Sequence, residues 1–119
     1  MLLENASRMN LLYDFYSGLL KKKQRDIFCM YYAEDLSLAE IAADLGISRQ
    51  GVHEALKKSA TALESYEDAL GLAAKYALAE ETMVLAGAAI DRLSEERARD
   101  LELTSRLRDI RSMLDRLEI

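Results

Sequence analysis

The sequence predicts an all-α protein, in which an N-terminal helical bundle contains a helix-turn-helix and a long helical extension follows it. The chain of 119 residues has no proline and only five glycines. Because proline breaks helices and marks loops, its absence indicates helix through nearly the whole chain. No segment shows the alternation of apolar and polar residues that is typical of a strand. We expect the helix-turn-helix domain over residues 1–66 and the extension over residues 67–119.

Apolar stripes predict the first two helices. Residues 5–17 form the first helix, and Gly18 is expected to end it. Residues 22–32 form the second helix, and residues 33–36 connect it to the third. The side chains that recur at helical spacing are Leu11, Leu12, Phe15 and Tyr16 in the first helix, and Ile27, Phe28, Tyr31 and Tyr32 in the second.

The third and fourth helices are predicted from their caps. Ser37 and Glu40 have the spacing of a capping box, which satisfies two backbone amides at the start of a helix over residues 38–45. Gly46 is its expected end, because glycine accepts a left-handed backbone. Ser48 is expected to cap a fourth helix that continues past residue 63, with weak points at Gly71 and Gly87.

The third and fourth helices together predict a helix-turn-helix. Ala42 is small where the two helices would approach most closely, and Gly46 lies in the turn. The shared core is expected to contain Ile41, Leu45, Ile47, Val52 and Leu56. Such a motif commonly binds nucleic acid, and a two-helix corner without a DNA role is the alternative.

If Val52 and Leu56 face inward, the fourth helix presents a polar face to solvent. Arg49 and Gln50 have side chains that form paired hydrogen bonds with guanine and adenine in the major groove. Ser48, at the helix N-terminus, is placed to hold a phosphate. The expected contact residues are Ser48, Arg49, Gln50, His53 and Lys57. Glu54 lies on the same face and would repel phosphates unless it reads a cytosine amino group. A plain solvated helix face is the alternative for each residue.

A basic cluster at the start of the second helix is the other candidate contact. Lys21, Lys22, Lys23 and Arg25 lie within five residues. Positive charges are unfavourable at a helix N-terminus. Because these residues oppose the helix dipole, we interpret them as functional, for example as contacts to phosphate. A solubilising run is the alternative. The contact residues expected here are Lys22, Lys23 and Arg25.

The charge balance limits any nucleic-acid surface to a local patch. The net charge is −5, and residues 67–119 hold most of the excess, with eight basic and twelve acidic side chains. Residues 1–66 hold eight basic and nine acidic side chains. A binding patch therefore has to lie on one face of the first half.

The sequence does not support an enzyme, a metalloprotein, a disulfide-linked protein or a membrane protein. His53 is the one histidine, and no neighbouring ligands or nucleophile make a metal site or a catalytic pair with it, so we expect no enzyme, no metal and no cofactor. Cys29 cannot form an internal disulfide and is expected to be a small buried side chain. With a single cysteine, a reducing cytoplasm is the simplest setting, and we expect no membrane span and no secretory signal.

The C-terminal part predicts a homodimer. Apolar residues follow 4-3-4-3 spacing, which is a heptad seam, at Leu103, Leu107, Ile110, Leu114 and Leu117. Such a stripe must pack either on the chain's own N-terminal domain or on a second copy. Since that domain has its own stripes to cover, a second copy is the favoured partner.

The residues of the helix-turn-helix resemble a known family. The matching segments, within Leu19 to Leu63, are residues 22–26, Tyr31-Tyr32, Asp35 to Leu38, Glu40 to Ala42, and Ile47 to His53. In them the chain resembles the YlxM-type helix-turn-helix proteins, small bacterial proteins similar to the promoter-reading region 4 of sigma factors. The resemblance covers roughly residues 8–76, and the remainder matches only as a helical tail.

This resemblance implies a winged-helix-like or sigma region 4-like fold and a regulatory, DNA-binding role without catalysis. Genes of this family often neighbour those of the signal recognition particle GTPase and its receptor, which implies a part in protein targeting. The alternative is a protein- or RNA-interaction module of the signal recognition particle that does not bind DNA. The acidic balance of the chain favours this alternative, and the face with Arg49 and Gln50 favours DNA.

Overall fold

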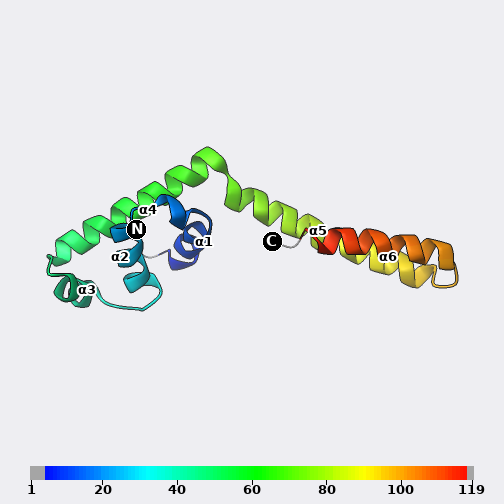
Figure 1. Ribbon diagram of the computed structural model, residues 1–119, viewed down its shortest axis with the longest axis horizontal. Coiled ribbons are helices and arrows are strands. Elements are labelled where there is room, and N and C mark those ends of the chain that lie inside the picture. The colour runs from blue at the N-terminus through cyan, green and yellow to red at the C-terminus, as the bar shows by residue number, and fades with distance from the viewer. Residues whose placement is uncertain (1–4, 118–119) are drawn as a thin grey trace. The chain divides into compact units, whose positions relative to one another are not determined.

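The computed structural model describes residues 5–117, which form six α-helices, one 3-10 helix and no strand. The elements are α1 (Ala6–Tyr16), η2 (Ser17–Leu19), α2 (Lys22–Tyr32), α3 (Leu38–Leu45), α4 (Arg49–Leu70), α5 (Leu72–Glu96) and α6 (Leu101–Asp115) (Figure 1). They divide into two compact units, with the boundary between Ala73 and Ala74. The all-α fold is confirmed.

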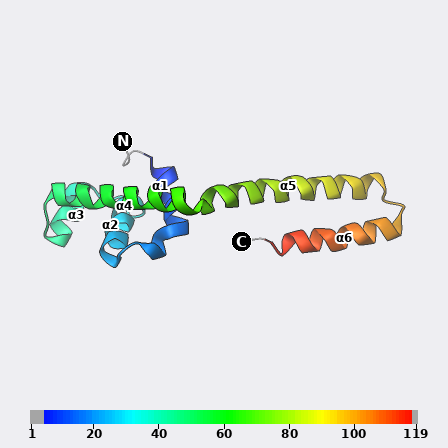
Figure 2. The ribbon, with the colours of Figure 1, turned by 90° about the horizontal axis from the view of Figure 1, so that it is seen from above.

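The first unit has two buried apolar clusters that share helix α4. The cluster on the side of α1 and α2 consists of Met9, Leu12, Tyr16, Leu20, Phe28, Ala60, Leu63 and Ala73. The cluster on the side of α3 consists of Ile27, Ile41, Ala42, Val52 and Leu56. Because α4 contacts α1, α2 and α3, its buried stripe fixes the positions of all three helices (Figure 2).

Capping interactions set the helix bounds of this unit as the sequence predicts, with one exception. The Ser37 hydroxyl accepts a hydrogen bond from the Glu40 amide at 3.0 Å, and the Glu40 carboxylate accepts one from the Ser37 amide at 3.1 Å. Gly46 ends α3 in the left-handed region at φ 69°. Gly18 instead lies inside the 3-10 helix, and α1 ends before it at Tyr16. A left-handed residue does occur in the connection before α3, where Asp35 has φ 55°.

The first unit extends beyond the predicted boundary at residue 66 because the end of α4 and the start of α5 are bonded to α1. Gly71 ends α4 at φ 63°, which confirms it as a weak point. The Tyr16 hydroxyl donates to Glu67 at 2.6 Å and accepts from the Leu72 amide at 3.0 Å. Glu67 also accepts from the Ala73 amide at 3.0 Å. Burial and the hydrogen bond to Glu67 raise the pKa of Tyr16.

The second unit is a hairpin in which α6 runs back along α5 (Figures 1 and 2). Gly87 was expected to be a weak point, yet α5 passes through it without a break. Gly87 is buried, and a Cβ there would collide with the Arg111 guanidinium of α6. The glycine therefore allows an arginine to cross the helix surface, where it lies 3.7 Å from Asp91.

The predicted heptad seam faces α5 of the same chain for part of its length. Leu107 is buried, and Leu103 and Leu114 are half-buried. Ile110 and Leu117 remain exposed. The stripe thus has a partner, α5 of the same chain, that is neither the N-terminal domain nor a second copy, the two partners expected from the sequence.

Candidate nucleic-acid interface

Helices α3 and α4 form a helix-turn-helix over a buried apolar cluster. Ile41 and Val52 are fully buried, and Leu56 is 1% exposed. The Ile47 amide donates to the Ala42 carbonyl at 3.1 Å, which closes the turn after Gly46. Leu45 was predicted to lie in this core, but it is 39% exposed because it ends α3 at the rim of the cluster. The buried cluster around Val52 and the closed turn at Ile47 together fix the position of the N-terminus of α4.

The first turn of α4 combines a cap with exposed polar side chains. The Ser48 hydroxyl accepts from the Gly51 amide at 2.9 Å, and its own proton remains available for an acceptor such as a phosphate oxygen. Arg49 and Gln50 are both exposed. The Gln50 amide nitrogen donates to the Glu54 carboxylate at 2.9 Å, so this side chain is held along the helix surface.

His53 does not lie fully on the outward face as predicted. It is half-buried, and its Nδ1 atom is inaccessible and has no hydrogen-bond partner in the part of the chain described. The reason is its position next to the buried Val52, since each helical residue turns only about 100° from the one before it. His53 therefore lies at the flank of the face rather than at its centre.

Lysines further along α4 extend the exposed polar face. Lys57 is exposed as predicted. Lys58 and Thr61 are also exposed, and neither was among the predicted contacts. Residues 50, 54, 58 and 61 follow one another at intervals of three or four. This helical spacing is the sequence signal that puts Lys58 and Thr61 on the same face as Gln50.

The basic cluster of α2 adjoins the turn of the helix-turn-helix. Lys22 and Lys23 line a surface hollow of about 400 Å³ together with Leu45 and Ile47, the residues on either side of the turn. Both lysines are exposed. Two segments that are distant in sequence thus bring positive charge to the N-terminal end of α4, where the helix dipole already favours an anion. Asp26 lines the same hollow and reduces its positive charge.

Arg25 is directed away from the role expected for it. Its guanidinium donates to the Leu20 carbonyl at 2.5 Å, and the side chain is half-buried. This bond ties α2 to the segment before it. Arg25 remains a predicted contact, but part of its hydrogen-bonding capacity serves the fold.

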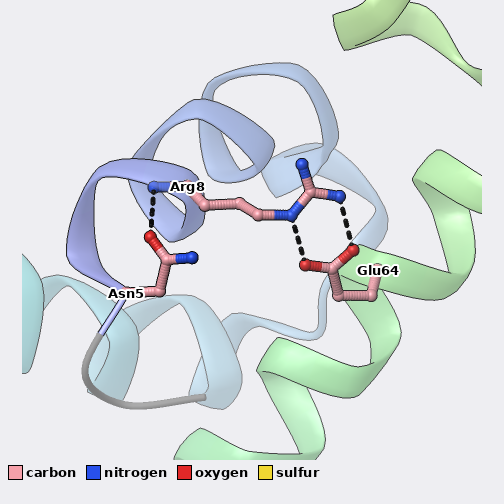
Figure 3. Close-up of polar contacts among 3 residues, drawn as sticks. All are labelled: Asn5, Arg8 and Glu64. Carbon is pink, nitrogen blue, oxygen red and sulfur yellow. Dashed lines mark hydrogen bonds and ion pairs between the residues drawn. The ribbon is translucent and has the colours of Figure 1, made fainter. Parts of the chain in front are cut away.

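Arg8 is neutralised by an acidic partner on α4. Its guanidinium forms paired hydrogen bonds with the Glu64 carboxylate at 2.6 and 2.7 Å, while its backbone amide is capped by Asn5 (Figure 3). The pairing raises the pKa of Arg8 and lowers that of Glu64. Arg8 therefore adds little to the positive charge of the first unit.

Three further features concern metal ligands, Cys29 and helix hydrophobicity. Residues 5–117 contain no group of three or more His, Cys, Asp or Glu side chains that could hold a metal ion. Cys29 is half-buried rather than buried, and its sulfur lies 3.1 Å from the Tyr13 hydroxyl oxygen. This contact is the main cause that raises the pKa of Tyr13 to about 12. Within the described part of the chain, no helix has the length and apolar character needed to cross a membrane.

The sequence matches one protein family along most of its length. The family is described as "Putative helix-turn-helix protein, YlxM / p13 like" (UPF0122), and the match spans residues 3–110. A UPF0122 protein of Geobacillus kaustophilus is 39% identical over 109 residues, which cover 92% of this chain and 96% of the relative. A UPF0122 protein of Thermoanaerobacter sp. (strain X514) is 40% identical over 111 residues, covering 93% and 94%.

A third relative is more similar over a shorter stretch. A UPF0122 protein of Caldanaerobacter subterraneus subsp. tengcongensis is 59% identical over 68 residues, which cover 57% of this chain and 58% of the relative.

Proposed function

Because the chain belongs to the UPF0122 family of YlxM/p13-like helix-turn-helix proteins, we propose that it is a DNA-binding regulatory protein that acts without catalysis. Helix α4 enters the major groove with its N-terminal turn, and the start of α2 contacts the phosphate backbone beside it. Such a role places the protein in the cytoplasm with the chromosome.

The observation that carries this proposal is the position of Lys22 and Lys23 beside the turn. They share a hollow with Leu45 and Ile47, and Ile47 immediately precedes the cap residue Ser48. A backbone phosphate at this point receives two lysine charges, the Ser48 hydroxyl and the dipole of a 22-residue helix. Phosphate contacts of this kind fix the register of a helix in the groove.

Arg49 and Gln50 are the side chains we assign to base reading. Both are exposed in the first turn of α4, and both have the donor geometry for paired hydrogen bonds to purine edges. Gln50 first has to exchange its bond with Glu54 for one with a base. Glu54 then either accepts from a cytosine amino group or repels the phosphates, so it contributes to specificity more than to affinity.

A protein- or RNA-interaction module of the signal recognition particle is the second candidate. The net charge of −5 favours its protein-binding form, because an acidic chain is repelled by DNA and RNA alike at long range. In that case the same surface of α3 and α4 would dock on a protein or on RNA of the particle.

Fluorescence anisotropy separates the two candidates. The full chain is titrated into a labelled random-sequence DNA duplex and into an RNA duplex of the same sequence, at about 50 mM salt. We expect DNA binding with a Kd in the micromolar range or tighter, as for nonspecific complexes at low salt. Absence of DNA binding at about 100 µM protein would refute the proposal, since nonspecific affinity is usually stronger than this. Capture of particle proteins that survives nuclease treatment would then support the second candidate.

A further inference from the structure

The second unit leaves one broad apolar face of its hairpin uncovered. Of its large apolar side chains, Leu107 is the one that is buried within the described residues 74–117, while eight others are exposed. An amphipathic helical hairpin is half of a bundle, because each apolar stripe needs a second layer against it. The packing of α6 on α5 therefore does not complete a core.

Helical geometry places half of these exposed apolar side chains on the same side. Leu78 and Leu117 line an apolar groove of about 510 Å³ between the two helices. Ile110 and Met113 on α6 lie two turns and one turn before Leu117, so they continue this side, whereas Leu85 lines a separate hollow with Glu81 and Val84. The opposite side of the hairpin is more polar, and the hollow there is lined by Glu80, Asp91, Arg111 and Asp115 among others.

We propose that this apolar face pairs with the same face of a second copy of the chain, so that two hairpins form a four-helix bundle. The floor of the groove is small, with Ala79, Thr82 and Ala86, and leaves room for the leucine ridge of the partner. A two-fold axis is the simplest arrangement, since an isologous interface needs only one self-complementary patch. The pairing helices are thus α5 and α6 together, not the predicted heptad seam of α6 alone.

The exposed apolar side chains supply a large part of the apolar surface that a stable dimer buries. Leu78, Ile110, Met113 and Leu117 are 45–65% exposed. A side chain of this size covers about 100 Å² of apolar surface, so the four leave about 200 Å² per copy in water. A standard interface buries roughly 800 Å² of each partner, and a little over half of that area is apolar. The four side chains therefore supply about half of the apolar area, and the small residues of the groove and the stems of the flanking charged residues supply the rest.

This pairing goes beyond the proposed DNA binding and does not depend on it. If both hold, one dimer presents two helix-turn-helix units, which suits two half-sites on a duplex. A different protein partner or the chain's own first unit would cover the face without producing a dimer.

Sedimentation equilibrium of the full chain without DNA tests the proposal. We expect a dimer at micromolar concentration. Leu78→Glu and Met113→Glu should each raise the dissociation constant about 100-fold or more, because every substitution occurs twice in a symmetric interface. Val84→Glu is the matched control: Val84 is 65% exposed, as is Leu78, but it lines the polar hollow on the other side. We expect the control to dimerise as the wild type does.

Two results would overturn the proposal. One is a monomeric wild-type chain up to about 100 µM, well above the dissociation constants of stable homodimers. The other is equal weakening by Val84→Glu. Thermal unfolding followed by circular dichroism confirms that each variant is folded. Because Leu78→Glu should still bind a duplex that holds a single site, a failed dimer and a failed DNA-binding function give different results.

Discussion

Removal of Lys22 and Lys23 should change the salt dependence of DNA binding by a calculable amount. Four exposed lysines on the proposed interface are assigned to phosphates, namely Lys22, Lys23, Lys57 and Lys58, while Arg49 is assigned to base reading. If each lysine neutralises one phosphate, log Kd should vary with log salt with a slope of about 3.6 in magnitude, so affinity falls about 150-fold between about 50 and 200 mM salt. With Lys22→Ala and Lys23→Ala the slope should drop to about 1.8, and the same change in salt should cost about 12-fold.

Anisotropy with a labelled duplex of about 12 base pairs, which holds one helix-turn-helix, measures this slope. A matched control removes two other charges, with Arg97→Ala and Arg99→Ala in the exposed turn between α5 and α6. We expect the control to keep the slope of the wild type. If the lysine variant keeps it too, or if the arginine variant lowers it equally, the hollow beside the turn does not contact phosphate.

Two further predictions concern the fold that supports this surface. Gly46→Ala should destabilise the protein by about 1–2 kcal/mol in chemical denaturation, because a Cβ finds open space there but the backbone is left-handed. Gly18→Ala also meets open space, at an ordinary φ, and should leave stability unchanged or slightly higher; equal losses would contradict the backbone argument. Glu64→Gln should weaken the link to Arg8 by less than about 1 kcal/mol at neutral pH. Since the pKa of Glu64 is lowered from about 4.5, the wild type should lose this advantage as pH falls through the folded value, and a difference that persists in acid would exclude the ion pair as its source.

The sequence was sufficient to predict the helix-turn-helix because its determinants are local. The Ser37–Glu40 box, the left-handed Gly46 and the Ser48 cap act within a few residues of the helix ends that they define. Gly18 and Gly87 gave the wrong signal because glycine ends a helix only where the backbone turns left-handed. At Gly87 the absence of a side chain instead makes room for Arg111, which lies 24 positions away in sequence.

Long-range packing determined what could not be predicted. The heptad spacing on α6 predicts that its apolar stripe is covered. The spacing does not determine whether residues 103, 107 and 114 pack on α5 or on another copy. In the same way, nothing local connects Lys22 and Lys23 with the turn at Gly46, because only the packing of α2 against α3 and α4 brings them together. The sequence also does not show that the Arg25 guanidinium donates to the Leu20 carbonyl, because this depends on the conformation of the side chain in the folded protein.

The central claim is that the first turn of α4 reads base edges. Selection of bound duplexes from a random library, with the wild type and with the double variant Arg49→Ala, Gln50→Ala, tests it most directly. Both side chains are exposed, so the variant should fold normally, and the loss of two base contacts should remove about 1–3 kcal/mol of discrimination per contact. We expect the wild type to enrich a common sequence and the variant to bind DNA without enriching it. Enrichment of the same sequence by both proteins would contradict the assignment.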